Sequence, residues 1–239
     1  MDNCRFTHSH YRDMLDAAAD IFSISTFADE PDETRRLYLR HDVDVSLKNA
    51  VALAEIESEM GITSTYFIPI NSPYYNLFND TQLRRVRRLS ELGHSIGLHV
   101  DERAAYMNGY DDIESMLTSV YGLLSEIVPL EKVLSFHMPS QYEFTRTTAI
   151  GDFVNAYSDR FNNGKNVKYL SDSNRHWREG CFCTHLDTGD YHSYQVLVHP
   201  VWWHAKPLGD NELFEKIKST NEEGLEVNLK GDLALFSDL

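Results

Sequence analysis

The chain has 239 residues, 42% of them hydrophobic and 25% charged, which is enough apolar material for the core of one fairly large globular domain over residues 1–239. It carries 22 Lys and Arg residues against 37 Asp and Glu residues, and the resulting formal net charge of -15 argues against general binding to nucleic acid or to anionic membranes. The sequence shows no run of about 18 apolar residues and no stretch typical of a signal peptide, so we expect a cytoplasmic protein with no membrane span.

The apolar pattern predicts strands and helices that alternate along most of the chain. An N-terminal helix over 11–22 is followed by a strand that begins at Leu37, a helix over 47–60 that ends at Gly61, and a strand over 62–68. Further helices are predicted over 81–92 and 111–128, further strands over 94–101, 132–137, 166–171, 181–186 and 194–199, and a long loop over 139–164. Repeated βα units of this kind predict an α/β fold, a distorted or incomplete (β/α) barrel.

Two carboxylates stand at the end of the strand that begins at Leu37. Asp42 and Asp44 are two residues apart in Leu-Arg-His-Asp-Val-Asp-Val, and the alternation of side chains along a strand puts both on one face. Helix capping explains one Asp but not a second one on the same face. Because ligands gather at the carboxyl ends of strands in parallel α/β folds, we expect these two side chains to share a functional site.

The strand predicted over 94–101 ends with two side chains of types that bind metals. His99 and Asp101 are two residues apart, so both are expected on one face, at the end of the barrel where Asp44 lies. Oxygen and imidazole ligands suit zinc, or less selectively iron, cobalt and nickel. A lone histidine is more often a core residue, but beside two carboxylates we interpret Asp44, His99 and Asp101 as a divalent metal site, with zinc as the expected ion.

Three more strand ends carry chemically useful side chains. His137 ends the fourth strand, and His199 ends an apolar strand just before a proline, where it can act as a general acid with a carboxylate base opposite. Aromatic rings nearby can stack on a sugar or can cover the core. The residues that we expect to position a sugar are Asp172, Arg175 and Trp177 after the strand over 166–171, and Trp202 and Trp203 after His199.

The three cysteines are predicted to be structural thiols. Cys181 and Cys183 alternate along the strand predicted over 181–186, and Cys4 is far away in the sequence. A zinc knuckle normally offers two close cysteine pairs, whereas this chain has a single Cys-x-Cys. We therefore expect no metal at the cysteines.

Five short motifs resemble those of the polysaccharide deacetylase superfamily, carbohydrate esterase family 4, and occur in the same order. They are Asp-Val-Asp, Gly-His-Ser-Ile-Gly-Leu-His, Phe-His-Met-Pro-Ser, Ser-Asp-Ser with a following Trp, and Leu-Val-His-Pro, between about Leu37 and Trp203. The resemblance implies a distorted (β/α) barrel and metal-dependent removal of acyl groups from N-acylated sugars. It also implies roles for four residues: Asp42 as catalytic base, Asp44 and His99 as metal ligands, and His199 as catalytic acid.

Three positions depart from the family pattern. The family's second metal histidine falls four residues after the first, where this chain has Arg103, and Asp101 is the neighbour that can replace it. The arginine that usually holds the catalytic base corresponds to His137, which either holds Asp42 or enters the metal shell. The adjacent Asp-Asp of the first motif is Asp42-Val43 here. These departures indicate a divergent branch.

The function that we predict is metal-dependent hydrolysis of an N-acyl amide, in the first instance an acetyl amide, on an amino sugar of surface-glycan or O-antigen precursor biosynthesis. A small substrate such as a sugar nucleotide or a lipid-linked amino sugar is expected in preference to a polymer, since no export signal is seen and Arg103, Arg175 and Arg178 suit a phosphate or carboxylate. Two alternatives stay open: a catalytically inactive carbohydrate-binding protein, and an amidase or deformylase acting on a non-polymeric amide.

Overall fold

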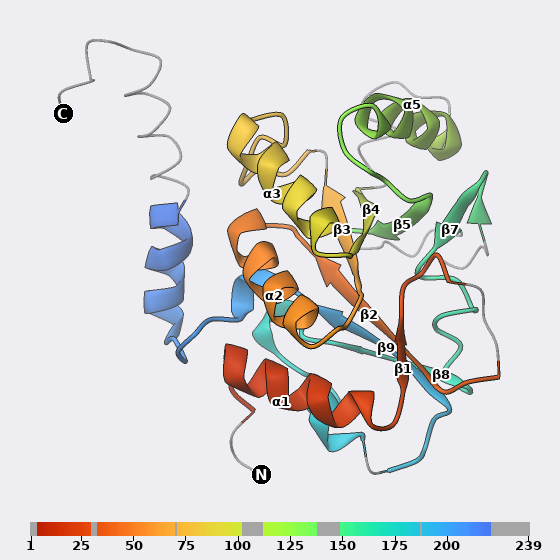
Figure 1. Cartoon of the computed structure of the whole chain (residues 1–239), viewed down its shortest axis with the longest axis vertical. Helices are drawn as coiled ribbons and strands as arrows, with labels where there is room; N and C mark the ends of the chain where they lie inside the picture. Colours follow the sequence, from red (N-terminus) through yellow and green to blue (C-terminus); the bar gives the residue numbers. More distant parts are fainter. Residues whose placement is uncertain are drawn as a thin grey trace.

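A computed structural model describes residues 4–29, 33–69, 71–101, 112–137, 149–186 and 188–220 (Figure 1). No helix in these ranges is long and apolar enough to cross a bilayer. The helices are α1 (His8–Ala19), α2 (Leu47–Glu59), α3 (Asp80–Glu91), α5 (Ile113–Ser125) and a helix over 210–220. The strands are β1 (Ser23–Ser25), β2 (Arg36–Asp42), β3 (Thr65–Pro69), β4 (Ser95–Val100), β5 (Val133–Phe136), β6 (Ala149–Ile150), β7 (Phe153–Asn155), β8 (Val167–Ser171) and β9 (Ser193–Val198).

The order of the strands is that of a barrel with one gap. The sheet runs β6-β7-β5-β4-β3-β2-β9-β8, with β1 paired to β2, and all neighbours are parallel except β6 and β7. The chain therefore lays β2, β3, β4, β5 and β7 side by side, then returns through β8 to β9, which pairs with β2. Pairing of the last strand with an early one is the closure of a (β/α) barrel. Within the described residues no pairing joins β7 to β8, so the predicted incomplete (β/α) barrel is confirmed.

Strand β2 separates the interior of this barrel from the layer of helices. Leu37 and Leu39 belong to the core cluster beneath α1 and α2, whereas Tyr38 packs with Phe27 and Phe67 in the interior. The alternation continues to the end of the strand, so Arg40 and Asp42 also face the interior. The strand is buried on both faces, as expected for a central parallel strand.

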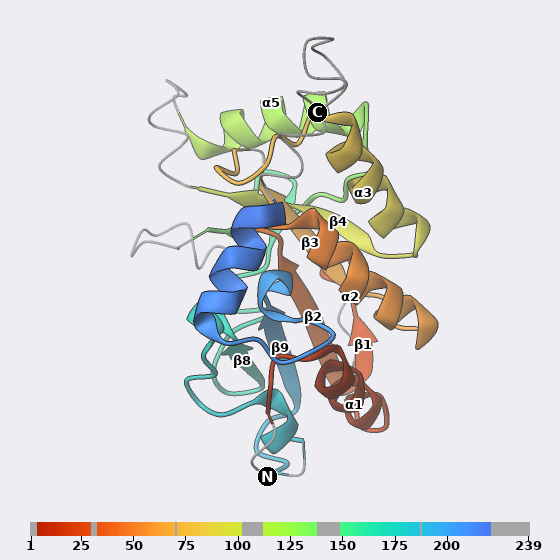
Figure 2. The same ribbon diagram turned by 90° about the vertical axis from the view of Figure 1, so that its left-hand side faces the viewer.

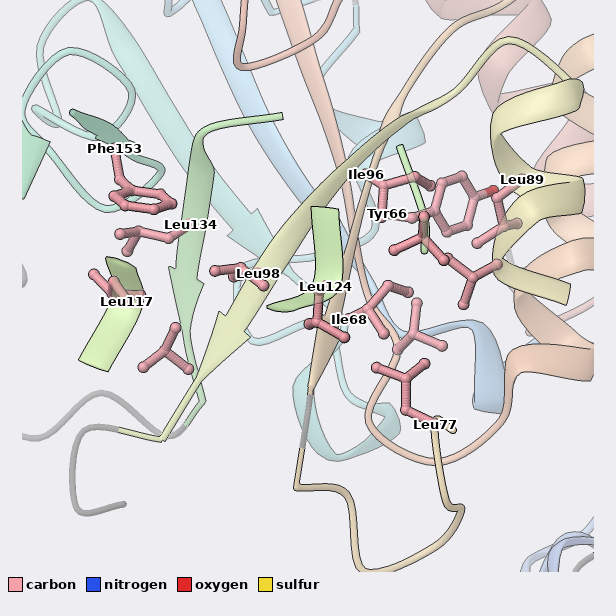
Figure 3. Close-up of a cluster of buried hydrophobic side chains, with 14 of the residues drawn as sticks. Tyr66, Ile68, Leu77, Leu89, Ile96, Leu98, Leu117, Leu124, Leu134 and Phe153 are labelled. Carbon is pink, nitrogen blue, oxygen red and sulfur yellow. The ribbon is translucent and has the colours of Figure 1, made fainter. Parts of the chain in front are cut away.

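The helices α1, α2 and α3 lie side by side along the outside of the sheet (Figures 1 and 2), and α5 covers β4 and β5. The apolar faces of α2, α3 and α5 meet the strands in the cluster of Figure 3, where Leu89 of α3 and Leu117 of α5 lie over the sheet, whereas α1 packs in a second cluster. Inside the barrel, Gly97 makes room for a ring, because a Cβ at this position would lie 2.7 Å from atoms of Phe67 and Val133. Small and large side chains on neighbouring strands thus fit each other.

Most of the predicted elements are observed within a few residues of their expected bounds, and one is wrong. Residues 181–186 were expected to form a strand, but Phe182–Thr184 is a 3-10 helical turn, closed by the Thr184 hydroxyl and amide on the Cys181 carbonyl. The long loop expected over 139–164 contains the short strands β6 and β7 where it is described. Strand β1 was not predicted, since three residues carry too little periodicity.

A buried carboxylate joins helix α2 to the outer face of the sheet. Glu57 is completely buried, with Oε1 at 2.7 Å from His41 Nε2 and Oε2 at 2.5 Å from the Ser64 hydroxyl. Tyr11 also donates to Oε1, and His94 Nδ1 lies 3.4 Å from Oε2. Burial by itself would raise the pKa of Glu57, but His41 and His94 outweigh it and lower that pKa below the ordinary 4.5. The carboxylate therefore stabilises the fold above its ordinary pKa, and this contribution is lost as the pH falls through the lowered value.

We expect Glu57→Leu to lower the free energy of unfolding by about 3–5 kcal/mol, because it leaves several buried polar groups without their acceptor. Glu59→Leu is the matched control, because Glu59 lies two residues further along α2 and forms only an exposed ion pair with Arg12 at 2.7 Å. That control should change the free energy of unfolding by less than about 1 kcal/mol. Urea unfolding followed by circular dichroism measures both, and equal losses in the two variants would contradict the role given to Glu57.

Candidate active site

The carboxyl ends of the parallel strands bring five polar side chains to one end of the barrel. Asp42 is the last residue of β2, His99 lies next to the end of β4, and His137 and His199 directly follow β5 and β9. Asp172 follows β8 in the same way. These ends surround a cavity of about 710 Å³. Its wall includes Asp42, Asp44, His99, His137, Tyr157, Tyr169, Trp177, Arg178, His199 and Trp202.

A two-point ion pair holds Asp42 in the floor of this cavity. Arg40 Nε donates to Oδ1 at 2.9 Å and Arg40 Nη2 to Oδ2 at 2.7 Å, and both side chains are almost fully buried. The remaining donors of Arg40 reach Gln195 Oε1 at 3.1 Å and the Tyr157 hydroxyl at 3.0 Å. Burial would raise the pKa of Asp42, but the guanidinium and the nearby His99 lower it. Asp42 is therefore held as a carboxylate in a fixed orientation.

Asp44, His99 and His137 form a group of three metal-binding side chains. His99 Nε2 lies 3.0 Å and His137 Nδ1 3.3 Å from Asp44 Oδ1, and one ligand atom of each residue lies within 4.8 Å of the others. Although burial works in the opposite direction, hydrogen bonds from the two histidines lower the pKa of Asp44. The hydrogen bond to Asp44 raises the pKa of His137 despite partial burial. One carboxylate oxygen and two imidazole nitrogens are a donor set suited to zinc or another divalent transition metal.

Ser135 orients His99 toward this group. The Ser135 hydroxyl lies 2.6 Å from His99 Nδ1 and donates to Asp42 Oδ1 at 3.4 Å. Because the hydroxyl hydrogen is directed to Asp42, its oxygen accepts from His99 Nδ1–H, and Nε2, which faces Asp44, is the nitrogen that a metal ion can take in place of a proton. A hydrogen bond on the second ring nitrogen is the usual way in which a protein fixes a metal-binding histidine.

His199 is held on the other side of Asp44 by a buried carboxylate. Asp172 Oδ1 lies 2.6 Å from His199 Nδ1 and accepts from the His199 amide at 2.9 Å. Trp203 Nε1 donates to Asp172 Oδ2 at 2.9 Å, so the carboxylate is fixed from two sides. With Nδ1 engaged, His199 directs Nε2 toward Asp44, at 3.7 Å from Oδ2. Burial lowers the pKa of His199, but Asp172, Asp42 and Asp44 together raise it to about 9.

Four residues expected at the site have other positions or roles. Asp101 directly follows β4, which ends at Val100, and it is not one of the metal-binding group of Asp44, His99 and His137. Asp172 is completely buried and holds His199 instead of facing a sugar. Trp203 lies in the core cluster beneath α1. Arg175 pairs with Asp210 at 2.8 Å and is not part of the cavity wall.

The other expected residues lie where they can reach a ligand. Trp177 and Trp202 line the cavity, as does Arg178. Arg103, which stands where the family has its second metal histidine, lies outside the described residues. Of the two positions left open for His137, the structure shows the one beside Asp44.

Two residues of the site were missed from the sequence. Arg40 holds Asp42 through two hydrogen bonds, and the signal for it was available, since it stands two residues before Asp42 on the same strand face. Ser135 carried no such signal, because a serine within an apolar strand reads as an ordinary core position. Its contact with His99 depends on the register of β4 against β5, which pairs these two residues directly.

No protein-family model and no curated protein matches the sequence. Solved structures similar to the chain include a family 4 carbohydrate esterase from Bacillus anthracis, with 14% identity over 88% of this chain and 86% of that one at a TM-score of 0.45. A peptidoglycan N-acetylglucosamine deacetylase matches with 14% identity over 81% and 85% at 0.48. A family 4 pseudoenzyme from Bacillus anthracis matches with 11% identity over 82% and 63% at 0.46. These structures are of the family whose motifs the sequence resembles, and the likeness is one of fold.

Substitution of single metal-binding residues should show whether His137 or Asp101 is the third protein ligand of the metal ion. We expect His137→Ala and Asp44→Ala to weaken binding of manganese(II) to the metal-free protein by more than about tenfold, since each removes a donor. Asp101→Asn is the control and should leave the affinity within about twofold of wild type, because Asp101 lies outside the group. Isothermal titration calorimetry on folded variants measures the affinities. A loss confined to Asp101→Asn would contradict the assignment.

Proposed function

We propose that this protein is a metal-dependent hydrolase that removes an acyl group from the nitrogen of an amino sugar. The observation that carries the proposal is a carboxylate and an imidazole that each lie close to a different residue of one metal-binding group. Asp42 Oδ2 lies 3.7 Å from His99 Nε2, and His199 Nε2 lies 3.7 Å from Asp44 Oδ2. Each of the two is held by a buried partner of opposite charge, Arg40 for Asp42 and Asp172 for His199.

Asp44, His99 and His137 would hold the divalent cation, and their oxygen and imidazole donors fit zinc best. A cation bound there polarises a carbonyl oxygen and lowers the pKa of a water molecule. The three side chains leave positions for non-protein ligands, as catalytic zinc sites with three protein ligands do. We propose zinc as the ion.

Asp42 and His199 divide the proton transfers. Asp42 is ionised and accepts a proton from the attacking water, whose oxygen bonds to the carbonyl carbon. The buried carboxylate of Asp172 raises the pKa of His199, so that Nδ1–H stays with Asp172 while Nε2–H is available on the side of Asp44. As the carbon–nitrogen bond breaks, Nε2–H passes to the leaving nitrogen, and the products are a carboxylate and a free amine.

The cavity supports a small substrate. A volume of about 710 Å³ lies within the range of small-molecule pockets. Trp177 and Trp202 provide aromatic surface for a sugar ring, and Arg178 provides a positive charge in its wall. We therefore propose an N-acetylated amino sugar carrying a phosphate, such as a sugar nucleotide, encountered in the cytoplasm. Arg178 would bind the phosphate, because Arg175 is paired with Asp210.

The test of this function is release of acetate by the metal-loaded protein. We expect turnover of uridine diphosphate N-acetylglucosamine and little or none of polymeric chitin. Asp42→Asn and His199→Gln should each lower the turnover about a hundredfold to ten-thousandfold, because each removes a positioned proton acceptor or donor. Arg175→Gln is the matched control and should keep near wild-type turnover, since Arg175 pairs outside the cavity.

Three results would contradict parts of the proposal. Efficient release of acetate from the polymer with none from sugar nucleotides overturns the small substrate. Binding of these sugars without turnover favours the inactive carbohydrate-binding protein. Turnover confined to amides or formamides that are not sugars favours the amidase or deformylase.

Asp172→Asn should shift the pH profile of the reaction. Asp172 raises the pKa of His199, so loss of its negative charge lowers that pKa and deprotonates the acid at a lower pH. We expect the alkaline limb of turnover to move to lower pH, while activity in the acidic range, where His199 remains protonated, falls less. A pH series of turnover for wild type and variant measures this shift. A uniform loss at every pH would instead indicate a purely structural role for Asp172.

A further inference from the structure

Three cysteines and one histidine meet at a second place in the molecule. Cys4 precedes helix α1, His10 lies in the first turn of α1, and Cys181 and Cys183 lie in the loop between β8 and β9. The four ligand atoms all lie within 4.8 Å of one another. None of these residues belongs to the group of Asp44, His99 and His137, and the proposed reaction uses none of them.

The distances within this cluster suit a tetrahedral zinc ion. Cys4 Sγ lies 3.3 Å from Cys183 Sγ, and His10 Nε2 lies 3.3 Å from Cys181 Sγ. Zinc–sulfur bonds of about 2.3 Å in a tetrahedron put two sulfur atoms roughly 3.8 Å apart, so small movements bring all four atoms to one ion. A disulfide requires about 2.05 Å between sulfur atoms, and all three cysteines are free thiols.

The turn over Phe182–Thr184 is what makes the cluster possible. In the strand expected there, side chains two residues apart are separated by roughly 6.6 Å along the chain. This separation is too large for Cys181 and Cys183 to bind one ion easily. The 3-10 turn is more compact, with a rise of about 2 Å per residue. It brings both sulfurs to the N-terminal segment, which supplies the other two ligands.

We infer that Cys4, His10, Cys181 and Cys183 bind one zinc ion, as a structural site separate from the candidate active site. Three thiolates and one imidazole complete the four positions of the ion, which is the ligand set of a closed structural site and leaves no place for a substrate. Binding replaces three thiol protons, which pass to the solvent. In this inference the three cysteines are metal ligands, whereas the sequence pattern predicted structural thiols without a metal.

The position of the site explains what the ion would stabilise. The loop that carries Cys181 also supplies Trp177 and Arg178 to the wall of the cavity, and the ion would tie this loop to the start of helix α1. His10 also stacks on Trp203, with ring centroids 6.1 Å apart and planes 13° apart. Trp203 in turn holds Asp172, the partner of His199. The zinc ion would thus fix the N-terminal segment against two supports of the candidate site.

The experiment uses the full chain with Asp44→Ala, because this substitution removes a ligand of the other metal-binding group. After reconstitution with zinc and removal of loosely bound ions, we expect about one zinc per chain by mass spectrometry of the metal content. Replacement by cobalt(II) should produce the intense near-ultraviolet absorption of thiolate-to-cobalt charge transfer and the visible bands of a tetrahedral ion. The cluster of Asp44, His99 and His137 contains no thiolate, so it cannot produce the first of these signals. The result therefore does not depend on the proposed function.

Cys4→Ser and Cys183→Ser, each combined with Asp44→Ala, should lose both the stoichiometric metal and the charge-transfer absorption. His176→Gln is the matched control, an exposed histidine of the same loop, and should keep both. If a cysteine variant fails to fold, the spectrum of Asp44→Ala alone still decides. Folded Asp44→Ala protein with less than about a tenth of an equivalent of metal, or a cobalt form without thiolate charge transfer, overturns the inference. So does a Cys4–Cys183 disulfide in the protein purified without reductant and offered zinc.

Discussion

The buried ion pair of Arg40 and Asp42 is the constraint on which the candidate site depends. Both charges lie inside an apolar barrel, where removal from water costs several kcal/mol per ion, and two direct hydrogen bonds with further contacts to Gln195 and Tyr157 offset that cost. Such a pair contributes little net stability compared with well-packed apolar side chains. Its consequence is orientation: Asp42 stays ionised and fixed beside His99. The alternation of β2 also directs His41 outward to Glu57, so one strand holds a buried carboxylate on each face.

Two histidines of the candidate site are each held by a neighbour from a different strand, whereas Asp42 is held by Arg40 of its own strand. Asp172, which follows β8, holds His199, which follows β9, and Ser135 of β5 holds His99 of β4. Since the strands are parallel and in register, these contacts form between side chains at the same level of the sheet. The inferred zinc site adds a support from outside the barrel, through His10 and its stack on Trp203. The proton donor of the proposed reaction thus depends on packing that extends to the N-terminal segment.

Local rules were sufficient for a large part of this structure. The helices and long strands follow from apolar periodicity, and the parallel sheet follows from their alternation. The same rules place Asp42, His99 and His199 together, because each stands at the end of an apolar strand and parallel strands end on one side. Arg40 was equally predictable from these rules, since it shares a strand face with Asp42. The sequence could not decide between His137 and Asp101 as the partner of Asp44, because the two lie at the ends of different strands and only the folded chain shows which one reaches it.

The sequence by itself therefore determined the fold class and the strand ends at which a site forms, since both depend on patterns within a few residues. Only the tertiary structure decided which side chains meet there. His137 follows β5 and reaches Asp44, which follows β2, although β4 and β3 lie between these two strands in the sheet. Asp172 contacts His199 because β8 lies beside β9, and both contacts join segments far apart in the chain. The cysteine cluster is the clearest example. No spacing in the sequence joins Cys4 to a turn almost 180 residues later, and their ligand atoms meet only because α1 packs against the loop after β8.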